Sequence, residues 1–252
     1  MRKCYWLTEA QMQRLRPYFP KSRGRARVDD RRVLSGIIFV NRNGLRWCDA
    51  PAAYGPPKTL YNRWKRWSDM GVFARIMMGL AEQASDNKTI SIDATYLKAH
   101  RTASSLRFKK GGRGRLIGLT KGGMNTKLHA ITDTSGRPIR LFITTGQVSD
   151  YTGAAALMNG FPEAEWLLAD RGYDADWFRD ALVDKGTRPC IPGRKSRTNT
   201  VKYDKRRYKR RNRIERMFGK LKDWRRIATR YDRSPTVFLS AIALAATIIF
   251  WL

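Results

Sequence analysis

Three carboxylates stand out in this 252-residue chain because each lies in a segment with a regular apolar pattern. Asp93 lies in the alternating stretch Ile-Ser-Ile-Asp-Ala-Thr, Asp170 ends the apolar run Trp-Leu-Leu-Ala-Asp, and Glu215 lies in a segment of helical period. Carboxylate oxygens are ligands that Mg²⁺ prefers, with substrate phosphate oxygens and water completing its shell. Two such ions roughly 4 Å apart activate an attacking water or 3′-hydroxyl and stabilise the leaving oxygen. The three residues therefore predict a two-metal site for phosphoryl transfer.

Each carboxylate also has a purely structural interpretation. Asp93 could be a solvated position on the outer face of an edge strand. Asp170 could simply cap the turn that follows its strand, although ligands of open α/β sheets favour that end of the strands. Glu215 could pair with Arg211 or Arg216, which contributes under about 1 kcal/mol at an exposed position.

The segment from residue 208 to residue 222 predicts a helix with one polar margin. At about 100° per residue, Tyr208, Arg211, Glu215 and Lys222 fall within roughly 60° of one another. The adjoining stripe is apolar and forms a good core face. Its members are Ile214, Met217, Phe218, Leu221 and Trp224.

The charge of the chain points to a polyanionic partner. Its 51 Lys and Arg against 21 Asp and Glu give a formal net charge of +30. Such a charge argues against an ordinary metabolic enzyme for small neutral substrates and favours nucleic acid, where basic residues release counterions from phosphates. Residues 188–233 hold 19 Lys and Arg against 4 Asp and Glu, which is half of the net charge.

The first part of the chain is typical of a small helical module. Thr8 is the expected N-cap of a first helix, Asp29 or Asp30 caps a second, and Thr59 opens a third after a loop over residues 41–57. This outline resembles a helix-turn-helix, and the third helix carries four basic candidates for DNA contact. They are Lys58, Arg63, Lys65 and Arg66. The alternative is a helical bundle whose basic face is only solvated.

The rest of the chain predicts a mixed sheet with helices on its faces. Strands are expected from Thr89, at residues 125–132 and 137–145, and as short runs at 166–169 and 187–192, with helices from Ser149 and over 174–185. Residues 101–123 are Gly-rich and basic and predict a mobile loop. The order of three strands followed by alternating helices and strands places the chain in the α/β class.

Two further features limit the interpretation. Cys4, Cys48 and Cys190 are isolated, which fits a reducing cytoplasm, and with only two histidines a zinc finger is excluded. The apolar stretch 237–252 has 16 residues, fewer than the about 20 of a membrane span, and is expected to be a buried terminal helix, with a tail anchor as the alternative.

Taken with their spacing, these motifs resemble the bacterial insertion-sequence transposases of the IS-five group, within the IS-four/IS-five superfamily of DDE transposases. The resemblance rests on four segments, with two, three and six residues between the key positions of the last. These segments are Ser-Ile-Asp93-Ala-Thr, Gly-Met-Asn-Thr-Lys-Leu-His129-Ala-Ile-Thr-Asp133, Leu-Leu-Ala-Asp170-Arg-Gly-Tyr-Asp and the series Tyr208, Arg211, Glu215, Lys222.

The resemblance covers essentially the whole chain and implies an RNase H-like catalytic core over residues 86–252, preceded by a helical DNA-binding domain over residues 1–85. It implies that Asp93, Asp170 and Glu215 bind two Mg²⁺ ions, for which Mn²⁺ is expected to substitute, and catalyse DNA cleavage and strand transfer of the cut-and-paste type. Further basic or polar residues are expected to contact DNA. They are Tyr208, Arg211, Lys222, Arg207 and Arg213 on or beside the signature helix, with Lys121, Lys127 and His129 as weaker candidates.

The implied partners are double-stranded DNA, both the terminal inverted repeats of the element and the target, and a second copy of the chain, with no membrane and a cytoplasmic, nucleoid-associated location. Two alternatives stay open at this point. One is a nuclease on the same core that leaves no strand-transfer product, and the other is a non-catalytic DNA-binding regulator.

Overall fold

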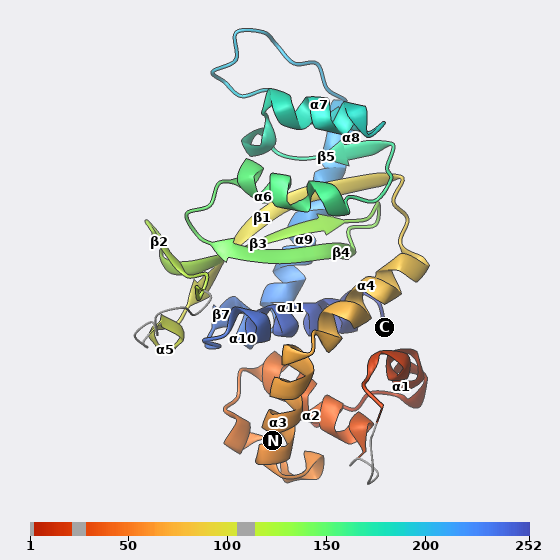
Figure 1. Ribbon diagram of the computed structural model, residues 1–252, viewed down its shortest axis with the longest axis vertical. Helices are drawn as coiled ribbons and strands as arrows, with labels where there is room; N and C mark the ends of the chain where they lie inside the picture. The colour runs from red at the N-terminus through yellow and green to blue at the C-terminus, as the bar shows by residue number, and fades with distance from the viewer. Residues whose placement is uncertain (1–2, 22–28, 105–113) are drawn as a thin grey trace. The chain divides into compact units, whose positions relative to one another are not determined.

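The structure is a computed structural model, and it describes residues 3–21, 29–104 and 114–252 (Figure 1). Short 3-10 turns join several of its elements: η1 (Arg16–Tyr18), η2 (Trp47–Asp49), η3 (Ala52–Tyr54), η4 (Met158–Gly160), η5 (Arg171–Tyr173) and η6 (Lys209–Arg211). The strands are β1 (Thr89–Ala99), β2 (Gly118–Thr120), β3 (Gly123–Thr132), β4 (Pro138–Thr145), β5 (Trp166–Leu168), β6 (Arg188–Cys190) and β7 (Thr229–Arg230). The helices are α1 (Glu9–Leu15), α2 (Asp30–Asn43), α3 (Pro57–Asp69), α4 (Val72–Ala84), α5 (Arg101–Ser104), α6 (Asp150–Leu157), α7 (Asp176–Asp184), α8 (Lys205–Tyr208), α9 (Asn212–Lys222), α10 (Arg225–Ala228) and α11 (Pro235–Phe250).

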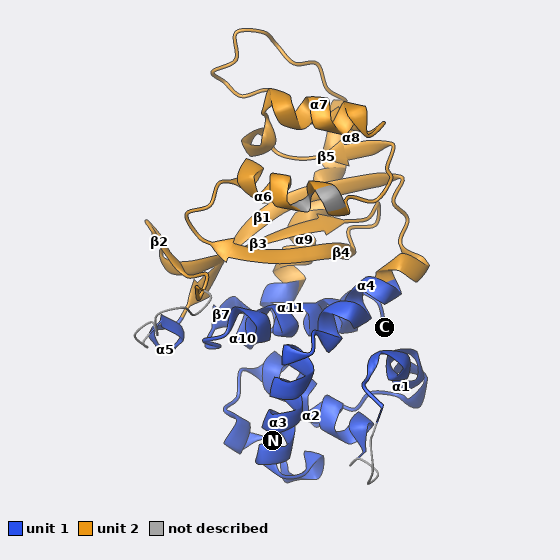
Figure 2. Cartoon of the chain, in the orientation of Figure 1, with its two compact units in different colours: residues 1–80, 100–106, 221–252 blue, residues 81–99, 107–220 orange. Residues whose placement is uncertain are grey.

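The contacts within the chain divide it into two compact units (Figure 2). Unit 1 comprises residues 1–80, 100–106 and 221–252, and unit 2 comprises residues 81–99 and 107–220. The C-terminal helix α11 therefore groups with the first helices of the chain. The division into a helical DNA-binding domain over residues 1–85 and a catalytic domain over residues 86–252 stays a prediction.

Unit 1 is held together by capped helices and an aromatic core. The Thr8 hydroxyl accepts the N–H of Gln11, whose side chain accepts the N–H of Thr8, so the predicted first cap is a full capping box. Asp29 caps α2, and Gly44 ends it with φ at 69°, in the left-handed region that glycine adopts without strain. Trp64 and Trp67 of α3 are fully buried, as their helical spacing predicts.

The end of the chain completes this unit. The predicted terminal helix is α11, and most of its side chains are buried against α2 and α3. Arg226 of α10 donates to the carbonyl oxygen of Leu45 at 2.9 Å, which fixes the turn after α2. No helix in the described part of the chain is long and apolar enough to span a membrane.

Unit 2 is built on a sheet whose strands run in the order β2-β3-β1-β5-β6, with β4 also paired to β3. β1 pairs antiparallel with β3 and parallel with β5, while β3 also pairs with β4 and β5 with β6. This confirms the predicted mixed sheet and makes β1 a central strand. Helix α6 covers one face of the sheet, and α9 crosses the opposite face (Figure 1).

The expected loop over residues 101–123 is only partly a loop. Its first residues form α5, and Gly118–Thr120 form β2, which pairs with β3, so the interpretation of the whole stretch as a mobile loop is wrong at both ends. Pairing with a long neighbouring strand overrides the weak strand propensity of this Gly-containing segment. The intervening residues 105–113 lie outside the described residues. So does most of the segment 21–27, whose basic, Gly-containing sequence predicts a joint between the first two helices.

Candidate active site

Asp93 lies on the central strand of the sheet and not on an edge, so the edge-strand interpretation of this residue is wrong. Its side chain is 15% exposed. One carboxylate oxygen, Oδ1, accepts the N–H of Ala94 at 2.8 Å, and Oδ2 accepts a hydrogen bond from Arg211. A carboxylate in the middle of a sheet therefore has both oxygens directed by specific donors.

Asp170 follows the strand that runs beside Asp93. The parallel pairing of β1 with β5 ends at Ser91 and Leu168, so Asp93 and Asp170 each lie two residues beyond this pair on neighbouring strands. The Oδ1 atom of Asp170 accepts the N–H of Gly172 at 2.8 Å, which is the capping role that its position also predicted. The turn thus fixes this carboxylate at the end of β5, beside Asp93.

Arg211 links the third carboxylate to the first. Its guanidinium donates to Oδ2 of Asp93 at 2.8 Å and to Oε1 of Glu215 at 2.5 Å. The ring of Tyr208 lies 5.8 Å from the same guanidinium. The structural alternative for Glu215, a pair with Arg211, is therefore observed, and the same pair brings Glu215 to Asp93. The predicted continuous helix is interrupted, since α8, η6 and α9 follow one another over this segment.

The carboxylates repel one another. Burial, together with the charges of Asp170 and Asp150, raises the pKa of Asp93 to about 6, although the N–H of Ala94 and the charge of Arg211 act to lower it. A carboxyl group with a raised pKa is one whose negative charge is incompletely neutralised by its surroundings. The arrangement would gain from a further cation.

These residues fit a divalent cation in donor type and in charge. Carboxylate oxygens are the donors that Mg²⁺ and Mn²⁺ take, and the pKa of Asp93, which burial raises, shows that its negative charge is costly in this site without a further cation. Within the described ranges, no three His, Cys, Asp or Glu side chains already stand close enough together to form a metal site. The guanidinium of Arg211 lies between Asp93 and Glu215 in this structure.

A fourth carboxylate, Asp150, lies beside Asp170 and was expected only as part of a helix cap. A Cβ atom placed on Gly172 would lie 2.8 Å from Oδ1 of Asp170 and 3.3 Å from Oδ2 of Asp150, so glycine permits this close approach. Asp150 forms a 2.8 Å ion pair with Lys127, whose side chain is 5% exposed. No sequence pattern joins a strand lysine to a helix aspartate 23 residues later, because only the packing of α6 on the sheet brings them together.

Of the four basic candidates on α3, two form ion pairs within the protein and two are exposed. Arg63 forms an ion pair with Asp30 at 3.3 Å, and Lys65 forms one with Asp69 at 2.6 Å. Lys58 and Arg66 are exposed on the same helix. The latter two therefore offer the more accessible positive charge for a phosphate.

The weaker candidates on β3 do not fit DNA contact. His129 is fully buried, stacks on Phe142 at 4.7 Å and packs against Gly153 of α6. Burial, with the nearby charge of Lys127, lowers the pKa of His129 to about 4, so the ring is neutral at pH 7. Lys127 is buried in its ion pair. Lys121, in the turn between β2 and β3, is exposed.

Two arginines in or beside the series Tyr208, Arg211, Glu215 and Lys222 contact other residues of unit 2. Arg207 lies over the ring of Trp166 at 4.3 Å, and Arg213 donates to the carbonyl oxygen of Thr134 in the β3–β4 turn. Lys222 is exposed at the end of α9, in the part of that helix that belongs to unit 1. Four exposed basic residues on α8 and η6 were not singled out from the sequence, although they lie in its most basic segment. They are Lys205, Arg206, Lys209 and Arg210.

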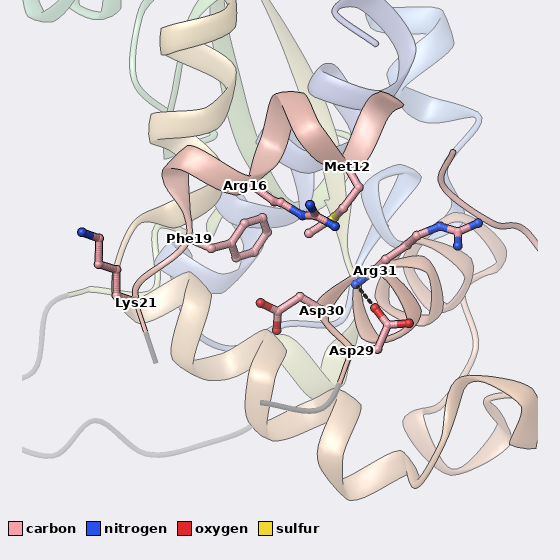
Figure 3. Close-up of a pocket in the computed structure, with 7 residues that line it drawn as sticks. All are labelled: Met12, Arg16, Phe19, Lys21, Asp29, Asp30 and Arg31. Atoms are coloured by element: carbon pink, nitrogen blue, oxygen red, sulfur yellow. Dashed lines mark hydrogen bonds between the residues drawn. The ribbon is translucent and has the colours of Figure 1, made fainter. Parts of the chain in front are cut away.

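A pocket elsewhere, in unit 1, contains none of the candidate catalytic residues (Figure 3). It lies between α1 with η1 and the start of α2, and its lining includes Arg16, Asp29 and Asp30. The Oδ1 atom of Asp29 accepts the N–H of Arg31 there, and Asp30 pairs with Arg63. Its charged groups thus serve helix capping and helix packing.

Comparison with known protein families agrees with this geometry. Residues 84–250 match the family described as "Transposase DDE domain", and residues 7–77 match "Putative transposase of IS4/5 family (DUF4096)". The chain belongs to the DDE transposase family. It is a DNA transposase of the IS4/5 type, and membership of the family implies dependence on a divalent metal ion and action on DNA.

Curated relatives support the same assignment. The transposase is 38% identical over 131 residues to "Putative transposase for insertion sequence element IS6501" of Brucella ovis, a match that covers 51% of this chain and 99% of the relative. It is 29% identical over 139 residues to "Putative transposase for insertion sequence element IS402" of Burkholderia cepacia, over 50% of this chain and 63% of that relative.

Among solved structures, the transposase resembles a piggyBac transposase solved as a synaptic complex with hairpin DNA. The TM-score is 0.53 at 7% sequence identity, over 94% of this chain and 69% of the other. At this identity the likeness concerns the fold, and it confirms the RNase H-like core with a mixed sheet that the sequence predicts.

Proposed function

We propose that Asp93, Asp170 and Glu215 are the catalytic carboxylates of this transposase and that together they hold two Mg²⁺ ions, for which Mn²⁺ substitutes. The observation that carries the proposal is the register of β1 and β5, which sets Asp93 and Asp170 side by side, with Glu215 joined to Asp93 through Arg211. When bound there, the ions supply the activation of a water or 3′-hydroxyl and the stabilisation of the leaving oxygen.

The protein contributes to the mechanism by holding the three carboxylates in fixed orientations. The N–H of Gly172 fixes Asp170, the N–H of Ala94 fixes Asp93, and Arg211 keeps Glu215 within reach of Asp93. Tyr208 lies beside the guanidinium of Arg211, and we assign Tyr208, Arg211 and Lys222 to the DNA backbone near the scissile phosphate. Fixed groups of this kind lower a barrier because they need no reorganisation during the reaction.

The reaction proposed is cut-and-paste transposition. A water attacks the phosphorus at the end of the element, which breaks the bond to the 3′-oxygen and leaves a 3′-hydroxyl and a 5′-phosphate. The freed 3′-hydroxyl then attacks a phosphodiester of the target DNA, so that a new phosphodiester bond forms and the 3′-hydroxyl of the target strand leaves. The basic face of α8 and η6, with Lys205, Arg206, Lys209 and Arg210, supports backbone binding without sequence preference.

Recognition of the terminal repeats is assigned to the helical region of residues 1–85, with Lys58 and Arg66 of α3 as its accessible basic residues. A dimer follows from the chemistry, because two element ends must be held together. Alanine at Lys58 or Arg66 is expected to weaken binding of end DNA more than binding of random DNA.

The test is a strand-transfer assay with end DNA, target DNA and Mg²⁺. Asp93→Asn, Asp170→Asn and Glu215→Gln should each reduce cleavage by at least about 10³-fold, as loss of a charge-stabilising group does, while DNA binding persists. Asp184→Asn, which changes an exposed aspartate at the end of α7, is the matched control and should cut normally.

The DNA products of this assay distinguish a transposase from a nuclease and from a DNA-binding regulator. If one of the three variants cuts at the wild-type rate, that residue is not catalytic. Cleavage without a joined product would replace transposition by a nuclease activity, and metal-independent binding with no cleavage would leave a DNA-binding regulator.

A further inference from the structure

The hydroxyl of Tyr173 is a buried polar group without a protein partner. Tyr173 is 0% exposed, and its Oη atom makes no hydrogen bond to any residue that the structure describes. Buried hydroxyl groups are nearly always paired with protein or ordered water, because an unpaired one loses its hydration without compensation. The position of this hydroxyl therefore calls for a partner other than the residues that the structure describes.

Tyr173 lies close to the carboxylates Asp170 and Asp150, both along the chain and through packing. It ends the short turn η5, which begins directly after Asp170, and its N–H donates to the carbonyl oxygen of Asp170 at 3.1 Å. The turn packs against α6, whose first residue is Asp150. Burial raises the pKa of Tyr173, and the charges of Asp150, Asp93 and Asp170 raise it further, so the hydroxyl keeps its proton and is a donor.

Asp150 has a carboxylate oxygen close to Asp170. Its Oδ1 atom pairs with Lys127, whereas Oδ2 lies 3.3 Å from the point where a Cβ on Gly172 would stand, with Oδ1 of Asp170 at 2.8 Å from that point. No hydrogen bond to Oδ2 is found over the described ranges. A buried donor hydroxyl and nearby carboxylate oxygens that make no direct hydrogen bond are commonly joined by water.

We propose that Tyr173 is a positioning residue for the divalent cation site: its hydroxyl donates a hydrogen bond to a water that is shared with Asp150 and Asp170. The water holds Asp170 in the orientation that binds the cation, and Lys127 balances the extra charge of Asp150. This inference rests on the proposed function, in which Asp93 and Asp170 are metal ligands. Groups that orient metal ligands through hydrogen bonds typically contribute 10–100-fold to metal affinity.

The experiment measures binding of Mn²⁺ ions to the metal-free full chain by electron paramagnetic resonance, together with the unfolding midpoint in urea. Tyr173→Phe removes only the hydroxyl. It should weaken Mn²⁺ binding by about 10-fold, while the midpoint of the metal-free protein stays the same or rises because an unpaired buried hydroxyl is gone.

Tyr54→Phe is the matched control. Tyr54 is as deeply buried, at 1% exposed, but its hydroxyl donates to the carbonyl oxygen of Tyr5 at 2.8 Å in unit 1. This variant should lower the unfolding midpoint and leave Mn²⁺ affinity unchanged. A merely structural role for Tyr173 would give the same pattern for both variants.

A third variant separates this inference from the proposed function. If Asp170→Asn loses Mn²⁺ binding while Tyr173→Phe binds as the wild type does, the proposal for Tyr173 is overturned and the catalytic assignment stands. If Asp170→Asn binds Mn²⁺ as the wild type does, the metal-ligand assignment fails and the role of Tyr173 fails with it.

Discussion

Two buried aspartates of unit 2, Asp93 and Asp174, lie in opposite electrostatic surroundings. Burial alone would raise the pKa of Asp174, but hydrogen bonds from Arg197, from the backbone N–H of Arg194 and from Arg179 hold that pKa at about 2. Burial, with the charges of Asp170 and Asp150, raises the pKa of Asp93 to about 6, because this carboxylate receives only one arginine and one backbone N–H.

The difference separates a structural carboxylate from one poised for chemistry. Asp174 anchors the segment after β6 to α7, and its charge is fully satisfied by the protein. Asp93 is left with an unsatisfied charge, which stabilises little in the metal-free chain and is available to a cation. Perturbed carboxyl groups of this second kind gather at functional sites.

The largest expected effect on stability comes from removing the charge of Asp174, the aspartate whose charge the protein neutralises. Asp174→Asn leaves Arg179 and Arg197 without their shared buried acceptor and should lower the free energy of unfolding by about 3–5 kcal/mol. Urea unfolding at pH 7 measures it. Asp180→Asn, an exposed change on the neighbouring helix α7, should lie within about 0.5 kcal/mol of the wild type. If Asp174→Asn lowers the free energy of unfolding no more than the control does, Asp174 does not anchor this segment.

Acid should weaken the same anchor. Because the folded pKa of Asp174 is lowered to about 2 from an ordinary value of 3.8, its contribution is complete above about pH 4 and is lost as pH falls towards 2. The stability difference between the wild type and Asp174→Asn should shrink by about 2 kcal/mol over that window. A difference that stays constant from pH 6 to pH 2 would contradict the low pKa.

The contribution of Asp93 to stability should change with pH in the opposite direction. Its folded pKa is raised to about 6, so its contribution to stability is present below about pH 4 and is lost as pH rises through 6. Asp93→Asn should therefore stabilise the metal-free protein by about 1–2 kcal/mol at pH 7, part of the full shift being offset by the lost bond to Arg211. The two proteins should unfold alike at pH 4, and destabilisation by this change at pH 7 would break the comparison.

The smallest effect concerns the close approach of Asp150 and Asp170. Gly172→Ala inserts a methyl group 2.8 Å from Oδ1 of Asp170 and should cost about 1 kcal/mol of stability. Gly219→Ala, on α9 with no atom within 4 Å of the added group, should stabilise by about 0.5–1 kcal/mol. Differential scanning calorimetry distinguishes the two signs. An equal gain in both would mean that the space beside Gly172 is open.

The sequence predicted what depends on local pattern. The cap at Thr8, the strand through Asp93, the helix that begins at Ser149 and the buried face of α3 all follow from spacing that the chain carries itself. The order of the strands within the sheet was not predicted from these elements, and the expectation that Asp93 and Asp170 share one site came from the resemblance to DDE transposases.

The remaining features depend on packing between distant segments. His129 and Lys127 carry polar side chains on a strand, yet α6 covers them, and no local rule shows which face of β3 it will take. The bridge from Arg211 to Asp93 spans 118 residues, and the place of Asp150 beside Asp170 depends on Gly172. Tertiary contacts of this kind override the exposure that a charged residue type suggests.

The central claim is that the charge around Asp93 is incomplete without a cation, and thermal unfolding at pH 7 with and without Mg²⁺ tests it most directly. At ten times its dissociation constant, Mg²⁺ should stabilise the wild type and Asp184→Asn by about 1.4 kcal/mol and raise their Tm, since the ion binds only the folded chain. Asp93→Asn and Asp170→Asn should be more stable or unchanged without the ion and should not respond to it. An equal rise of Tm in all four proteins would contradict the account.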